Sequence, residues 1–286
     1  MVRRKFWKLI FVATLIFGFG ISVFGKAAKD SQVFLKENLE TWDRENVAGG
    51  TGTLAGKFSF TRNNAEPSFV IKEIGWMTLK PGDSIGSHAH GDNEDAYVIV
   101  SGTGEFTGSD GKAVKVGPQD ITIARPGQSH ALKNTGTEPL VFLDVVSKSV
   151  ELTEEQKKEV LEAKQYFPKE ELFTWDRMDL GGGKGKLGGT FAFSRNDSKP
   201  SYTIYEMGWY TLGPGDSIGH HKHVDNDDAI ILVVGEGEFS DTDNVITKVG
   251  PGAITIARPG QAHGLVNTGK ETMLLFGAIA KEPPKK

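Results

Sequence analysis

The sequence contains no cysteine among its 286 residues. The protein therefore has no disulfide bonds and cannot be anchored as a lipoprotein, because both require a cysteine thiol. Strong helix signals are also scarce, whereas glycine is abundant, with 36 residues. Because glycine punctuates turns, this composition favours many short strands over long helices.

The N-terminus carries the one long hydrophobic run of the sequence, the 16 residues from Leu9 to Phe24. A basic segment, MVRRKFWK, precedes this run, and the small residues Gly25, Ala27 and Ala28 follow it. This order is typical of a secretory signal, so we expect residues 1–27 to be removed and the mature protein to be exported, periplasmic or secreted, without membrane contact. The alternative is an uncleaved membrane anchor, although 16 residues are short for a bilayer span.

The sequence also has fewer basic than acidic residues, 33 against 37. The formal net charge is −4, and the expected signal carries five basic residues and no acidic one, so its removal leaves a charge of about −9. Surfaces that bind nucleic acid are basic, so this balance argues against a nucleic-acid partner. A small-molecule ligand is the expected partner.

The chain contains one pattern written twice. TWDRENVAGGTGTLAGKFSF begins at Thr41, and TWDRMDLGGGKGKLGGTFAF begins at Thr174, 133 residues later. The spacing of 133 holds without a gap as far as Asn134 and Asn267, which indicates a tandem duplication of one domain. The expected divisions are an N-terminal domain at 28–150, a connector at 151–170 and a C-terminal domain at 171–286.

Each copy has the pattern of an all-β domain. Short apolar segments such as AYVIVSGTGEF alternate with turns rich in glycine and proline, at the spacing of a sandwich or barrel. Between the copies, Thr153 to Phe167 form the best helix candidate. Thr153 and Gln156 suit a capping box, and Pro168 would end the helix.

The segment HAHGDNED, from His88 to Asp95, suggests half of a metal site. Residues two apart on a strand project to the same face, so His88 and His90 would point into one cavity. His130 supplies a third imidazole, and Glu94 or Asp95 supplies a carboxylate. Such a set suits a divalent transition metal, Mn, Fe, Ni, Cu or Zn, without choosing among them.

The second copy repeats this set, with His221, His223, His263 and either Asp227 or Asp228. An isolated His-x-His pair is more often a surface or hydrogen-bonding pair than a ligand pair. Here, however, six of the seven histidines fall into two matched triplets, each with an acid at the same spacing. The repetition favours two metal sites, although one inherited site could be inactive.

The paired motifs resemble those of the cupin superfamily. The first family motif is Gly, five residues, His-x-His, three or four residues, an acid, six residues and Gly, and here it runs from Gly82 to Gly102 and from Gly215 to Gly235. The second motif ends in Pro-x-Gly, two residues, His, three residues and Asn, which matches the segments ending at Asn134 and Asn267. The chain departs from it at three positions, with Gln119 in place of a glycine and Arg125 and Arg258 in place of a proline.

The resemblance implies a bicupin, an all-β protein of two tandem cupin-type barrels (double-stranded β-helix, or jelly roll) joined by a short helix. Such barrels commonly pack face to face, and the chain could also form homo-oligomers. Counting back six residues from the closing glycines selects Asp95 and Asp228 as the acidic ligands. Asp95 also shares its strand face with Tyr97 and Ile99, which are large enough to line a barrel.

Four other residues shared by the copies are candidates for substrate binding. Arg125 and Arg258 could clamp a carboxylate or phosphate, or form surface or inter-domain salt bridges. Trp76 and Trp209 could stack on a sugar ring, although packing in the core or at an interface is favoured.

The function favoured by the sequence is an exported metal-binding bicupin, with the metal available for chemistry on a small anionic or sugar-derived metabolite. In that case the metal would act as a Lewis acid or as an oxygen-activating centre. The alternative is a non-catalytic module that binds carbohydrate or metal, and a third interpretation is a pair of sites without metal. The cupin fold hosts enzymes and binding proteins alike, so the sequence does not decide whether this protein is an enzyme.

Overall fold

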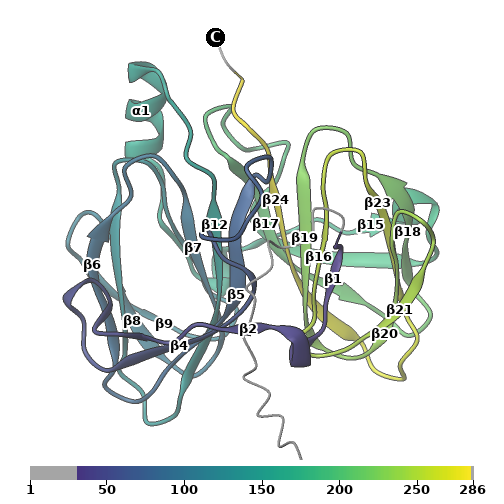
Figure 1. Ribbon diagram of the computed structural model, residues 1–286, viewed down its shortest axis with the longest axis horizontal. Coiled ribbons are helices and arrows are strands. Elements are labelled where there is room, and N and C mark those ends of the chain that lie inside the picture. Colours follow the sequence, from purple (N-terminus) through teal and green to yellow (C-terminus); the bar gives the residue numbers. More distant parts are fainter. Residues whose placement is uncertain (1–30, 285–286) are drawn as a thin grey trace, which may run out of the picture.

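The computed structural model describes residues 31–284, and the expected signal at 1–27 lies outside these residues. Two β-barrels stand side by side, one formed mainly by each copy of the repeat (Figure 1). The expectation of two tandem barrels is therefore confirmed. Among the described residues, no helix has the length and apolar character needed to cross a bilayer.

Each barrel consists of one large and one small antiparallel sheet. The large sheets face each other in the middle of the molecule, and the small sheets lie on the outer sides (Figure 1). The large sheet of the N-terminal barrel contains β2 (Glu40–Thr41), β3 (Arg44–Glu45), β4 (Thr53–Phe60), β5 (Ile71–Leu79), β7 (Asp95–Ser101), β10 (Ile121–Ala124), β12 (Leu140–Ser147) and β13 (Tyr166–Phe167). Its small sheet contains β6 (Ser84–Ala89), β8 (Gly104–Thr107), β9 (Ala113–Val116) and β11 (Ser129–Asn134).

The C-terminal barrel repeats this arrangement. Its large sheet contains β1 (Val33–Phe34), β14 (Phe173–Thr174), β15 (Arg177–Met178), β16 (Lys186–Phe193), β17 (Ile204–Leu212), β19 (Asp227–Val234), β22 (Ile254–Ala257) and β24 (Met273–Ala280). Its small sheet contains β18 (Ser217–Lys222), β20 (Gly237–Ser240), β21 (Ile246–Val249) and β23 (Ala262–Asn267). Four 3-10 turns complete the elements: η1 (Lys36–Asn38), η2 (Val47–Gly49), η3 (Lys169–Glu171) and η4 (Leu180–Gly182).

The two copies exchange their first strands. β1 precedes the N-terminal barrel in sequence but pairs with β22 of the C-terminal barrel, so the purple end of the chain lies in the green and yellow barrel (Figure 1). β13 precedes the C-terminal barrel but pairs with β10 of the N-terminal barrel. Each barrel therefore also uses a strand that lies outside the division expected for it, 28–150 or 171–286.

The helix in the connector is shorter than expected. Helix α1 (Glu154–Leu161) begins with the expected capping box, in which Thr153 and Gln156 bond each other's backbone amides. It ends well before Phe167, because Tyr166 and Phe167 form the exchanged strand β13. Pairing with β10 satisfies their backbone groups in a sheet and removes them from the helix.

Alternate residues of the central strands serve two different cores. On β7, Tyr97 and Ile99 face the interior of the N-terminal barrel, whereas Ala96 and Val98 face the other barrel. A single apolar cluster between the barrels contains residues of both, including Leu143 and Phe276. The barrels therefore share a core, and the interior of each remains available for a site.

Candidate metal centres

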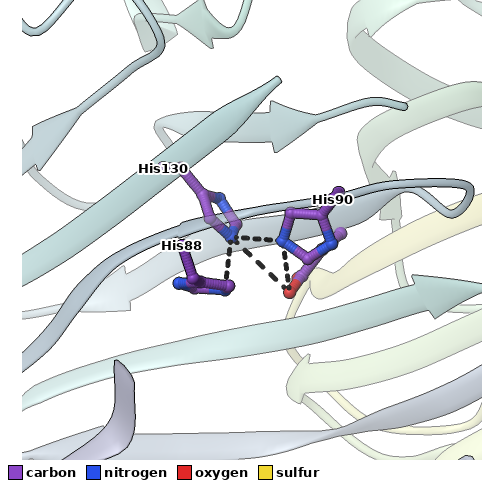
Figure 2. Close-up of side chains that lie close together, drawn as sticks. His88, His90 and His130 are labelled. Carbon is purple, nitrogen blue, oxygen red and sulfur yellow. Dashed lines mark hydrogen bonds and ion pairs between the residues drawn. The ribbon is translucent and has the colours of Figure 1, made fainter. Parts of the chain in front are cut away.

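Three histidines and one aspartate converge inside the N-terminal barrel. Figure 2 shows the rings of His88, His90 and His130 pointing toward one another. The Nε2 atoms of His90 and His88 lie 3.0 Å and 3.2 Å from Nε2 of His130. A carboxylate oxygen of Asp95 lies 3.5 Å from His90 Nε2 and 3.6 Å from His130 Nε2.

Strands carry His88, His130 and Asp95, and His90 directly follows β6. His88 lies on β6, which pairs with β11, and the register sets His88 directly opposite His130. Asp95 begins β7, on the facing sheet. The histidines therefore approach from one sheet and the carboxylate from the other, so the barrel itself fixes the cluster.

Hydrogen bonds orient the rings for metal binding. His88 donates from Nδ1 to the carbonyl oxygen of Gly86, at 3.0 Å, which leaves its Nε2 lone pair directed into the cluster. His221 does the same with the carbonyl of Gly219, at 2.8 Å. The side-chain amide of Asn93 lies 3.4 Å from His90 Nδ1.

Burial keeps the imidazoles in the form that binds metal. It lowers the pKa of His90, of His130, of His223 and, most strongly, of His263 below the ordinary histidine value. Because only a neutral imidazole offers its nitrogen lone pair, these shifts favour coordination near neutral pH.

The C-terminal barrel holds a matching cluster. His223 Nε2 lies 3.1 Å from His263 Nε2, and an oxygen of Asp228 lies 3.7 Å from the first nitrogen and 3.8 Å from the second. With His221, their donor atoms all lie within 4.8 Å of one another, as they do in the first cluster. His220, the one remaining histidine, lies outside the cluster and contacts the carbonyl oxygen of Asp241.

The donor sets fit a divalent transition metal. Imidazole nitrogens about 2.1 Å from one ion lie roughly 3 Å apart, which is the spacing of the Nε2 atoms in both clusters. Three imidazoles and one carboxylate suit Mn, Fe, Ni, Cu or Zn, and the donors do not select one of these.

The neighbouring acids Glu94 and Asp227 point the other way, toward the opposite barrel. Glu94 is fully buried and accepts hydrogen bonds from the backbone amides of Thr203 and Ile204, at 3.1 Å and 2.7 Å. Asp227 accepts the corresponding bonds from Val70 and Ile71, both at 2.8 Å. These acids therefore join the barrels, and Asp95 and Asp228 are the acids placed at the clusters.

The arginines proposed as substrate clamps also lie between the barrels. Arg125 is buried, lies 3.5 Å from Glu94, and has its guanidinium carbon 3.8 Å from the ring centre of Tyr202. Arg258 lies in the same way over Phe69, at 3.7 Å. Each guanidinium group therefore packs against an aromatic ring of the other copy.

Trp76 and Trp209 likewise serve the contact between barrels. The indole nitrogen of Trp76 donates to the carbonyl oxygen of Gly252, and that of Trp209 donates to the carbonyl oxygen of Gln119, at 3.1 Å and 2.9 Å. Each bond crosses from one barrel to the other. The packing interpretation favoured for the two tryptophans thus agrees with their position.

Sequence reasoning missed the guanidinium groups nearest the clusters. Arg62 bonds the buried Glu73 at 3.0 Å, and Arg195 bonds the buried Glu206 at 2.8 Å. Arg177, from the TWDR segment of the second copy, lies 3.5 Å from Glu206. The repetition of arginine at matching positions, 62 with 195 and 44 with 177, was the available signal.

Asp144 was also missed. It is buried inside the N-terminal barrel, where burial and the nearby carboxylates of Asp95 and Glu73 raise the pKa of Asp144 well above its usual range. The corresponding residue of the second copy is Gly277. A charged residue within the apolar strand LVFLDVVS was the signal for this site.

The cupin domain model matches residues 75–146 and 208–278, together half of the chain. The chain belongs to the cupin family. Its two matches coincide with the two barrels, so the protein is a bicupin.

Individual relatives agree with this assignment. An oxalate-binding protein of Thermotoga maritima is 39% identical over 70 residues, which are 24% of this chain and 57% of that protein, so the match spans little more than half of the relative's length. A variant of Bacillus subtilis oxalate decarboxylase is similar in structure, with a TM-score of 0.63, 17% identity, and 90% of this chain and 78% of that chain covered. The formate complex of Lactobacillus farciminis oxalate decarboxylase is similar as well, with a TM-score of 0.62 and 14% identity. The match covers 90% of this chain and 87% of that chain. At these identities the structural likeness establishes the fold alone.

Proposed function

We propose that this bicupin binds a divalent transition metal in its barrels and uses it to capture a small carboxylate anion, with oxalate as the first candidate. The observation that carries the proposal is the convergence of three imidazoles and one carboxylate inside each barrel. The name of the Thermotoga maritima relative, an oxalate-binding protein, supports the choice of anion.

Different residues of each barrel would have different roles in binding the anion. The imidazoles and Asp95 or Asp228 hold the metal, which when bound supplies a Lewis acid for carboxylate oxygens. Arg195, fixed by two bonds to Glu206, adds a guanidinium that attracts the anion. Apolar side chains around the clusters, such as Ile85 and Ile218, exclude water and strengthen these interactions.

Capture can be tested with purified protein loaded with Mn²⁺, Fe²⁺, Ni²⁺, Cu²⁺ or Zn²⁺. Elemental analysis should give two metal ions per wild-type chain, and calorimetry should show oxalate binding that disappears after chelation. Replacing His90 and His223 together by alanine should abolish both. A wild-type chain that retains no metal after loading would disprove the proposal.

A second candidate function is turnover of the anion, and Asp144 is the observation that favours it. This buried carboxyl group lies beside Asp95 without being one of the four convergent donors. Similar structures are those of oxalate decarboxylases. Formate and carbon dioxide released from oxalate by the loaded wild type, but not by Asp144→Asn, would establish turnover, and their absence would leave capture as the function.

We further propose that the protein acts outside the cytoplasm. The basic and apolar order of residues 1–27 supports this location. Cell fractionation should recover a chain shortened by about the length of that segment. Recovery of the full-length chain in the membrane fraction would support the anchor, and recovery in the cytoplasm would contradict export.

A further inference from the structure

The interiors of the two barrels differ, although the metal-binding residues of one barrel match those of the other. The four metal-binding residues are the same in the two copies. The barrels differ instead in the residues that surround these ligands. The pairs that differ include Met77 and Tyr210, Tyr97 and Ile230, and Asp144 and Gly277.

The C-terminal centre opens into a cavity that is rich in positive charge. The cavity has a volume of about 170 Å³, and His221, His223, Asp228 and His263 all line it. Arg177 and Arg195 line it as well, whereas Asp228 is the one acidic residue among its lining. Such a balance draws an anion toward the metal ligands.

The size of this cavity limits the anion. Pockets for drug-sized ligands measure roughly 300–1,000 Å³, well above the volume found here. Ile218, Ile230 and Ile279 form apolar walls. A carboxylate of a few heavy atoms would fill the space, with its charged oxygens toward the metal ligands and guanidinium groups.

The N-terminal centre is more crowded at the same place. The ring of Tyr97 stacks on the ring of His130, with ring centres 4.4 Å apart and planes inclined by 15°. The equivalent residue of the second barrel is Ile230, which has no ring that could stack on His263. Asp144 adds a further carboxyl group beside Asp95, where the second barrel has Gly277. A ring that covers one histidine and a further side chain beside Asp95 both leave less room for an incoming anion.

We infer that the two centres do different things: the C-terminal centre binds the small carboxylate anion, and the N-terminal centre holds its metal without exchanging an anion. This inference rests on the proposed capture of the anion, because it assigns the captured anion to one of the two metal centres, and it is the alternative to turnover at Asp144, which belongs to the other centre. The side chains that make the difference are Ile230 in the open centre, and Tyr97 and Asp144 in the crowded one.

The first experiment removes one centre at a time from the Mn²⁺-loaded protein. His90→Ala and His223→Ala are a matched pair at equivalent positions, and each should lower the metal content by one ion per chain. Oxalate should bind once to the wild type, and His223→Ala should lose at least about 100-fold in affinity, a far larger loss than that of His90→Ala.

Two oxalate ions per wild-type chain, or unchanged binding by His223→Ala, would overturn the inference while leaving the proposed function intact. No oxalate binding by the fully loaded wild type would instead refute the proposed function. The two failures are therefore distinguishable in one series of titrations.

The second experiment keeps all eight ligands and exchanges the residues above them. Ile230→Tyr should retain two metal ions per chain but weaken oxalate binding at least about tenfold, because the added ring covers His263. Water proton relaxation by bound Mn²⁺ provides an independent measurement: oxalate should displace water in the wild type and in Tyr97→Phe, but not in Ile230→Tyr. Unchanged oxalate affinity in Ile230→Tyr, with its metal content intact, would contradict the steric argument.

Discussion

At the scale of single residues, two adjacent acids perform different tasks because a strand turns consecutive side chains to opposite faces. Asp95 faces the interior of its barrel and meets the histidines, whereas Glu94 faces the other barrel and accepts two backbone amides there. Burial raises the pKa of Glu94, against the opposing effect of Arg125 and these amides. One residue of displacement thus separates a metal ligand from a structural contact.

Substitution of each acid by its amide should separate these tasks. Asp95→Asn removes a negative ligand, so metal affinity at the N-terminal centre should fall roughly 10- to 100-fold. Glu94→Gln leaves the ligands in place but weakens the bonds to Thr203 and Ile204, and should cost about 1–3 kcal/mol of unfolding free energy. Metal titration and chemical denaturation of both variants measure the two effects, and loss of metal in Glu94→Gln would contradict the assignment.

Gly277 provides a second prediction at this scale. A Cβ atom at this position would lie 2.0 Å from a ring carbon of Tyr210, whose hydroxyl group bonds Glu206. Gly277→Ala should therefore destabilise the protein by about 1–3 kcal/mol. Adding Tyr210→Met, the residue of the first copy, should recover much of this loss in thermal denaturation; equal stability of Gly277→Ala and the wild type would refute the argument.

The sequence predicts the ligands better than their surroundings. Strand parity and motif spacing both select Asp95 over Glu94, because both are local properties of the chain. Asp144 is not predictable in this way, since its strand β12 is paired with β7 from a distant part of the sequence. The same limit explains why Arg125, close to His130 in sequence, was considered for the site although it lies between the barrels.

At the scale of elements, the exchanged strands link each repeat to the barrel of the other. Gln32, next to β1, accepts bonds from Thr242 and donates to the carbonyl oxygen of Ala262, all in the C-terminal half. Strands of two residues show no alternation that a sequence pattern could reveal. Their partners are determined by long-range packing, so the exchange could not be predicted, whereas the long strands and the helix cap could.

Gln32→Ala should consequently affect the barrel that is distant in sequence. Loss of these buried hydrogen bonds should cost about 1–3 kcal/mol. Hydrogen exchange should accelerate first in β22, whose Ile256 amide bonds the carbonyl oxygen of Gln32, and not in β10 of the N-terminal barrel. Gln165→Ala, at the equivalent position, is the matched control and should reverse the pattern, because Ile123 of β10 bonds the carbonyl oxygen of Gln165. If both variants accelerated hydrogen exchange in the same barrel, the result would contradict the proposed pairing of each first strand with the other barrel.

At the scale of the whole molecule, the contact between barrels is continuous with their cores. The shared apolar cluster includes fully buried residues of both copies, among them Ile121, Leu143, Ile254 and Phe276. Glu94 and Asp227 add bonds in both directions, and the exchanged strands add two more connections. The duplication predicts two barrels, but the face on which they meet follows from side chains that only the folded pair brings together.

A molecule connected in this way should unfold as one unit, and metal bound at either centre should stabilise both barrels. At a free metal concentration of 100 Kd, one occupied site adds about 2.7 kcal/mol, equivalent to a rise in Tm of roughly 5 °C for a chain of this size. In His223→Ala, metal can occupy only the N-terminal centre, yet circular dichroism should show a single transition with this rise, and hydrogen exchange should also slow in β24 of the C-terminal barrel. Two separate transitions, of which metal shifts only one, would show instead that the barrels are independent, and the shared cluster would then have no role in coupling the two centres.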